Sequence, residues 1–157
     1  MMRPHERLDF ACHLARTAGA IASAFYARTL DIRQKSGGEQ VTTADLAAND
    51  FLIRELRRVC PGEPILSEEG PHDEARVAEK RAWIIDPIDG TRELITGTGQ
   101  FATHIGWVEG GQPQVGVVYQ AAAGVLYGGV VGSGAFVETC GARSELRVSA
   151  KSQINAM

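Results

Sequence analysis

The sequence predicts an α+β domain, with two amino-terminal helices packed on a mostly antiparallel sheet. In about the first 60 residues, apolar side chains recur at steps of three and four residues, which is the period of a helix. From residue 101 onward the pattern changes to short β-rich runs joined by a few residues each. Such short connections impose antiparallel pairing, because parallel neighbours need a long crossover. At 157 residues the chain has the length of one domain, and we expect a single lobe over residues 1–157.

The first predicted helix covers about residues 5–30, where alanine and larger apolar side chains form one stripe that we expect to face the core. Residues 31–40 are expected to be a connection. A second helix starts at Thr42 or Thr43, because either hydroxyl can cap its first turn, and it ends near Cys60-Pro61-Gly62. Its candidate apolar positions are Leu46, Phe51, Leu52, Leu56 and Val59.

The strands are predicted from short apolar runs bounded by turn residues. Ala82 to Ile85 predicts a buried strand, and Ile65-Leu66 predicts a shorter one. The charged segment 71–81 between them fits either a flap or a short helix. The four runs of the predicted meander are Phe101 to Val108, Gln114 to Gln120, Val125 to Val131 and Gly134 to Val137.

The most informative motif is Asp86-Pro87-Ile88-Asp89-Gly90-Thr91, which follows the predicted buried strand directly. Two acids this close raise each other's pKa unless a cation lies between them. Carboxylate oxygens beside a free backbone carbonyl suit Mg²⁺ better than zinc. Pro87 fixes one φ angle, and Gly90 permits a tight turn and the close approach of another group. The alternative is an ordinary strand-ending turn, because Asp, Pro and Gly are all turn residues.

Two further acidic elements favour the metal site. Ser67-Glu68-Glu69-Gly70 closes the short strand, and Asp45 lies in the first turn of the second helix. Taken singly, the glutamates can be a solvated turn and Asp45 a favourable charge at the helix start. Taken together, three acidic elements at one helix start and two strand ends are harder to explain as turns.

In their order and spacing these motifs resemble the inositol monophosphatase-like superfamily of Mg²⁺-dependent phosphatases. The motifs are Val41-Thr42-Thr43-Ala44-Asp45, Leu66-Ser67-Glu68-Glu69 and Trp83 to Thr91. The continuation Arg92-Glu93-Leu94 is closer to the Lys-Glu-Phe of 3'(2'),5'-bisphosphate nucleotidases than to the Asn-Phe of inositol monophosphatases, and Ser67 favours the same branch. Leu94 in place of Phe departs from that pattern.

The resemblance implies a site with two or three Mg²⁺ ions. Glu68, Asp86 and the Ile88 carbonyl are expected to hold the first ion, while Asp86 bridges to a second ion that Asp89 also binds. The family carries a lysine near the position of Lys35, where a solvated loop lysine is an equally good interpretation.

The resemblance also implies catalytic roles. Thr91, supported by Asp45, is expected to orient the attacking water together with Glu68. Backbone N–H groups of Gly90 and Thr91, at the start of the next helix, are expected to bind phosphate oxygens. The implied reaction is hydrolysis of adenosine 3',5'-bisphosphate to AMP and phosphate. The alternatives are an inositol-1-phosphate, sugar-phosphate or histidinol-phosphate phosphatase, and a truncated metal-binding lobe without catalysis.

Members of the family have a second, carboxy-terminal lobe whose Trp-Asp motif completes a metal site. No Trp-Asp occurs here, because Trp83 precedes Ile84 and Trp107 precedes Val108. We therefore expect this chain to represent the amino-terminal lobe, weakly active or inactive by itself, with an uncovered face that associates.

Composition limits the partners. The net charge of -3 and the lack of a basic cluster disfavour a nucleic acid polymer, and no apolar run is long enough to span a membrane. We expect a small phosphorylated substrate and a homodimer. The three widely spaced cysteines and the absence of a signal-peptide pattern favour the cytoplasm.

Overall fold

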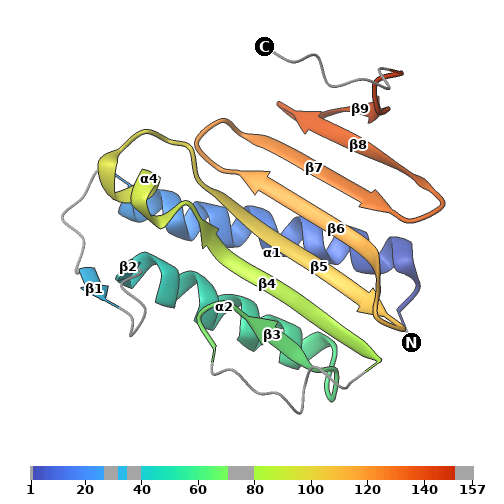
Figure 1. Cartoon of the computed structure of the whole chain (residues 1–157), viewed down its shortest axis with the longest axis horizontal. Coiled ribbons are helices and arrows are strands. Elements are labelled where there is room, and N and C mark those ends of the chain that lie inside the picture. The colour runs from blue at the N-terminus through green and yellow to red at the C-terminus, as the bar shows by residue number, and fades with distance from the viewer. Residues whose placement is uncertain (1, 27–31, 35–39, 71–79, 151–157) are drawn as a thin grey trace.

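The computed structural model describes residues 2–26, 32–34, 40–70 and 80–150. Helices α1 (Pro4–Phe25) and α2 (Thr43–Val59) pack on a seven-stranded sheet of order β3-β4-β5-β6-β7-β8-β9 (Figure 1). The strands are β3 (Ile65–Ser67), β4 (Arg81–Asp89), β5 (Ala102–Glu109), β6 (Gln112–Gln120), β7 (Val125–Val130), β8 (Gly134–Thr139) and β9 (Ala142–Leu146). Only the pair β3–β4 in this sheet is parallel. The predicted fold class is confirmed.

Three smaller differences separate the predicted elements from the observed ones. The first helix ends at Phe25 rather than near residue 30, because Tyr26 is extended at ψ 134°. The predicted connection 31–40 contains β1 (Ile32–Gln34) and the start of β2 (Gln40–Thr42), which pair with each other. Strand β9 was not predicted, since its sequence Ala-Arg-Ser-Glu-Leu has little apolar character. Most of segment 71–81 lies outside the described residues.

Helix α2 begins and ends where its capping residues predict. Thr42 is the N-cap, and its hydroxyl accepts a hydrogen bond from the Ala44 N–H at 3.2 Å. Leu52 and Leu56 are fully buried, whereas Leu46 is 36% exposed, so its prediction as a core position is wrong. Six residues separate Leu46 from Leu52, which is not a whole number of turns, and the two side chains therefore point in different directions.

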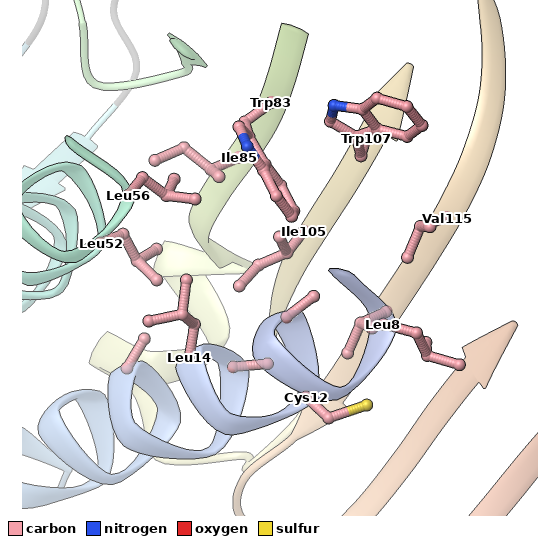
Figure 2. Close-up of a cluster of buried hydrophobic side chains, with 14 of the residues drawn as sticks. Leu8, Cys12, Leu14, Leu52, Leu56, Trp83, Ile85, Ile105, Trp107 and Val115 are labelled. Atoms are coloured by element: carbon pink, nitrogen blue, oxygen red, sulfur yellow. The ribbon is translucent and has the colours of Figure 1, made fainter. Parts of the chain in front are cut away.

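The core lies between the helices and one face of the sheet. Figure 2 shows Trp83 and Ile85 of β4 and Ile105 of β5 meeting Leu14 of α1 and Leu52 of α2. Burial of each such large side chain contributes about 2 kcal/mol. This packing fixes β4 along its length, and the strand delivers its carboxyl end to the rim of the sheet.

A buried arginine, not anticipated from the sequence, joins α1 to this core. Arg7 is 1% exposed and donates two hydrogen bonds to Glu63, at 2.6 and 2.5 Å. Its guanidinium lies 4.0 Å from the centre of the Trp107 ring. Glu63 also accepts a hydrogen bond from the Trp83 Nε1–H at 2.8 Å, so one carboxylate ties the helix to the start of β4.

The two faces of the sheet differ. The covered face carries Trp83 and Ile85 against the helices. The opposite face carries Ile84 and Asp86 and, among the described residues, has no helix packed on it; we call it the open face. Ile84 is 44% exposed, so the prediction that the whole run from Ala82 to Ile85 is buried is wrong at this position. In the described part of the chain, no helix is long and apolar enough to cross a membrane.

Candidate active site

The two strand ends bring Glu68 and Asp86 together. Strands β3 and β4 are parallel, and the Glu68 N–H donates to the Ile85 carbonyl at 3.2 Å, so their carboxyl ends meet at one rim. Partial burial, a hydrogen bond with Glu68 and the charges of Glu68 and Asp89 together raise the pKa of Asp86 to about 8. The sequence predicts that Asp86 and Asp89 raise each other's pKa, and the charge of Asp89 does contribute to the raised pKa of Asp86, after burial and Glu68.

An irregularity in β4 separates Asp86 from Asp89. The register with β5 shifts between the two residues, as expected where a proline cannot donate to the ladder. The Pro87 carbonyl accepts instead from the Thr103 hydroxyl at 2.9 Å, and the Ile88 N–H donates to Asp86 Oδ1 at 3.1 Å. The two aspartates therefore face different surroundings.

Asp89 lies on the exposed side of the rim, beside a histidine. Its side chain is 62% exposed, and its Oδ2 is 3.5 Å from Nε2 of His104. His104 stands opposite Asp86 in the β4–β5 ladder, on the open face. The sequence marked His104 only as a residue of a strand, and the strand alternation alone could have placed it on the same face as Asp86.

Asp45 is fully buried and uses both carboxylate oxygens. Its Oδ2 accepts from the N–H and the hydroxyl of Thr42, at 2.7 and 2.6 Å. Its Oδ1 accepts from the Thr91 hydroxyl at 2.9 Å. Asp45 therefore both caps the start of α2 and holds the Thr91 hydroxyl. Because the hydroxyl proton of Thr91 is directed to Asp45, the lone pairs of this oxygen can accept a hydrogen bond from water.

The turn after Asp89 requires glycine. Gly90 has φ 91°, and a Cβ on it would lie 2.8 Å from the Gln100 carbonyl oxygen. Helix α4 (Thr91–Thr96) starts at the next residue, and the side chain of Leu94 anchors it in a small buried cluster that includes Ile88. The predicted tight turn and close backbone approach are confirmed.

Asn49 supports the turn at Glu68-Glu69, a role that was not predicted from the sequence. The Ser67 hydroxyl contacts Asn49 Oδ1 at 2.6 Å and accepts from the Glu69 N–H at 3.2 Å. Asn49 and Asp45 are four residues apart, so they share one face of α2. Two polar side chains at this spacing, on the face that also carries Leu52 and Leu56, are a signal that could have found Asn49.

The oxygen donors on the rim fit Mg²⁺, although they are not gathered in one cluster. Within the described residues, no three His, Cys, Asp or Glu side chains converge as a metal group. The rim instead holds the pair Glu68–Asp86 and, beside it, Asp89. Backbone carbonyls and water also serve as Mg²⁺ ligands, and a carboxyl whose pKa is raised by acidic neighbours marks a place where a cation is favourable. Lys35 lies outside the described residues.

A large hollow of about 1090 Å³ extends over the open face from this rim. Glu68, Asp86 and His104 line it, together with apolar residues such as Ile84 and Tyr127. The arrangement offers acidic oxygens for cations at the rim and an apolar surface beyond it. A phosphorylated molecule bound at the rim requires cations to reverse the negative field.

Known proteins resemble this chain in both sequence and fold. A model of the inositol monophosphatase family matches residues 3–156. The 3'(2'),5'-bisphosphate nucleotidase CysQ of Escherichia coli O157:H7 is 39% identical over 144 residues, which cover 90% of this chain and 58% of that relative. The fructose-1,6-bisphosphatase/inositol-1-monophosphatase of Thermotoga maritima is 34% identical over 132 residues, covering 83% of this chain and 50% of that relative.

Solved structures agree with these relatives. A Thermotoga maritima IMPase superposes with a TM-score of 0.82 at 34% identity, covering 92% of this chain and 54% of that one. CysQ from Bacteroides thetaiotaomicron gives a TM-score of 0.70 at 31% identity, covering 85% and 49%. This chain therefore spans between about half and three fifths of the length of these proteins. The resemblance predicted from the three motifs is confirmed.

Proposed function

This chain belongs to the inositol monophosphatase family, and we propose that it forms the metal-binding lobe of a Mg²⁺-dependent phosphomonoesterase. The proposed reaction is hydrolysis of adenosine 3',5'-bisphosphate to AMP and phosphate. The observation that carries this proposal is the meeting of Glu68 and Asp86 at one rim, where partial burial and the neighbouring Glu68 and Asp89 raise the pKa of Asp86 to about 8. Beside them lies the hydrogen bond from the Thr91 hydroxyl to the buried Asp45. The relatives named as bisphosphate nucleotidases support the substrate.

The proposed roles follow the positions on the rim. Glu68, Asp86, Asp89 and the Ile88 carbonyl would hold Mg²⁺, which would supply charge stabilisation and activation of water. Asp45 fixes the Thr91 hydroxyl, and the Thr91 oxygen accepts a hydrogen bond from the attacking water and so orients it toward phosphorus. Glu68 accepts from the same water, and the N–H groups of Gly90 and Thr91 bind phosphate oxygens.

The longer relatives suggest what this lobe lacks. We propose that the further carboxylate of the second metal site lies in the part of the relatives that this chain does not match. A lobe without that carboxylate loses a contact that acts on the transition state, which typically costs a hundred- to thousandfold in turnover. The non-catalytic alternative differs from this proposal only in predicting no turnover in any longer form.

The test compares phosphate release by the 157-residue chain with release by a version extended, from its own coding DNA, through the part its relatives have. We expect negligible turnover for the first and clear turnover for the second. Comparable turnover in both would mean that this lobe builds a complete site. Thr91→Ala should lower kcat of the extended form at least about a hundredfold, whereas Thr91→Ser, which keeps the hydroxyl, should retain most of it.

A second candidate substrate is inositol 1-phosphate, because the Thermotoga maritima relative carries that activity in its name at 34% identity. A panel at equal concentration separates the candidates: adenosine 3',5'-bisphosphate, inositol 1-phosphate, fructose 1,6-bisphosphate and histidinol phosphate. A preference for any of the last three would overturn the nucleotide assignment and leave the phosphatase. The homodimer and the cytoplasmic location remain predictions.

A further inference from the structure

Helix α2 carries two buried polar side chains on one face, one turn apart. Asp45 is fully buried and Asn49 is 6% exposed, and four residues of helix separate them by about 6 Å along the axis. Asp45 accepts a hydrogen bond from Thr91, which follows β4, and Asn49 Oδ1 contacts the hydroxyl of Ser67, the last residue of β3. One helix therefore contacts the ends of both strands that form the acidic rim (Figure 1).

The Ser67 hydroxyl links Asn49 to the backbone of the glutamate turn. Its oxygen accepts a hydrogen bond from the Glu69 N–H at 3.2 Å. A hydroxyl has a single proton to donate, and the contact of 2.6 Å directs that proton to Asn49 Oδ1. Because Asn49 is more than nine-tenths buried, removing the acceptor would leave the Ser67 hydroxyl without its bond at a site that water reaches poorly.

Strand alternation places Ser67 and Glu68 on opposite faces of the sheet. Ser67 stands beside Ile85 in the parallel ladder of β3 and β4, and Ile85 belongs to the core under the helices. Glu68 is the next residue and lines the hollow of the open face together with Asp86. The side chain of Ser67 is therefore held by α2 on the covered face, while its neighbour presents a carboxylate on the open face.

Three hydrogen bonds fix the backbone around Glu68. The Glu68 N–H donates to strand β4 at 3.2 Å, the Glu69 N–H donates to the Ser67 hydroxyl, and the Gly70 N–H donates to the Ser67 carbonyl at 3.1 Å. The second of these bonds exists only while the Ser67 side chain keeps its rotamer. Asn49 supplies the contact that holds this rotamer.

We propose that Asn49 is a positioning residue for Glu68: by holding the Ser67 hydroxyl, it fixes the backbone from which the Glu68 carboxylate reaches the rim. This inference rests on the proposed function, in which Glu68 would hold Mg²⁺ and orient the attacking water. Asp45 holds Thr91, the other group that orients the water, from the same face of α2. One turn of a packed helix therefore sets the distance between the two groups.

A positioning role has a consequence for metal selectivity. Mg²⁺ requires a nearly ideal octahedral set of ligands, whereas Ca²⁺ accepts irregular ones. A glutamate whose backbone is less well fixed should therefore lose more affinity for Mg²⁺ than for Ca²⁺. Because both ions are divalent, the ratio of the two affinities is insensitive to a change of charge near the site, and it reports the placement of the ligands.

Displacement of Mn²⁺ from the 157-residue chain by Mg²⁺ or Ca²⁺, followed by electron paramagnetic resonance of the free Mn²⁺, measures both affinities. Asn49→Leu keeps the branched shape of the side chain but cannot accept a hydrogen bond. Its affinity for Mg²⁺ should fall at least about tenfold, and its affinity for Ca²⁺ less than about threefold. Asn49→Asp keeps an accepting oxygen and should retain the ratio of the parent.

Two further variants separate positioning from a merely structural role. Ser67→Ala should change the ratio as Asn49→Leu does, and the double variant should add nothing, since both substitutions remove the same bond. Leu56→Ala removes a fully buried side chain of the same helix without touching Ser67. It should lower the urea midpoint more than Asn49→Leu does, yet keep the Mg²⁺ to Ca²⁺ ratio of the parent.

The outcomes distinguish this inference from the proposed function. Equal losses of Mg²⁺ and Ca²⁺ affinity in Asn49→Leu, or a ratio that Leu56→Ala changes as strongly, would overturn the positioning role. If Asp86→Asn abolishes metal binding while Asn49→Leu binds Mg²⁺ like the parent, the positioning role fails alone. If the parent binds neither ion, the proposed function fails and the positioning role fails with it.

Discussion

The covered and open faces of the same sheet differ in how much space lies above their glycines. On the covered face, an added Cβ at Gly128 would meet the Phe136 ring at 2.7 Å, because Phe136 and Leu8 fill the space above the glycine. On the open face, Gly106 and Gly116 are cross-strand neighbours, and a Cβ on Gly116 meets nothing within 4 Å. Glycine inside a strand often marks the close approach of another backbone.

One face of the sheet stabilises the fold, and the other carries the candidate active site. The covered face holds the buried core, whereas the open face carries Asp86 and the hollow beyond it. Ile84, at 44% exposed, and Tyr127, at 42% exposed, are unusually accessible for large apolar side chains inside strands. We propose that the part of the longer relatives that this chain does not match covers this face, and three variants test how far the two faces differ.

The largest effect is expected from two adjacent isoleucines of β4. Ile85 is 2% exposed and Ile84 is 44% exposed. Ile85→Ala should lower the free energy of unfolding by about 2–5 kcal/mol through lost burial and a cavity, whereas Ile84→Ala should cost less than about 1 kcal/mol. Urea unfolding of both variants measures the difference. Equal losses would contradict the distinction between the faces.

The next effect concerns metal binding at the open rim. Asp86→Asn removes the proposed bridging carboxylate while keeping the shape of the side chain, so the affinity for Mg²⁺ and Mn²⁺ should fall below detection with the fold intact. Isothermal titration calorimetry measures the affinity. Asp9→Asn, an exposed position on α1, is the control and should bind like the parent. Unchanged affinity in Asp86→Asn would show that Asp86 is not a metal ligand.

The smallest effect is a pH dependence of the metal-free protein. The pKa of Asp86 is about 8 in the folded chain, above its ordinary value when unfolded. The folded state therefore binds the extra proton, and its stability should fall as the pH rises toward and through 8. Thermal melts in chelator should show a lower Tm at pH 9 than at pH 6, with a smaller difference in Asp86→Asn. If Tm fell by the same amount between pH 6 and pH 9 in Asp86→Asn, the pH dependence would come from other groups.

The rim and the helix starts were predictable because their determinants are local. The turn after Asp89 depends on Gly90, and the start of α2 depends on Thr42 and Asp45, all within a few residues of the structure they specify. The antiparallel meander was predictable for the same reason, since short connections permit only neighbours that run in opposite directions.

Contacts between distant segments were not predictable. Arg7 and Glu63 are 56 residues apart, and Ser67 reaches Asn49 across 18 residues. The exposure of Ile84 depends on which face of the sheet the helices cover. Strand β9 depends on its pairing with β8, because its own residues have little strand character. The amino-acid sequence by itself determined the acidic rim, the capping residues and the order of elements. Only the tertiary structure decided which face the helices bury, which polar pairs form and which edge stays open, because these depend on packing between segments rather than on local conformational preference.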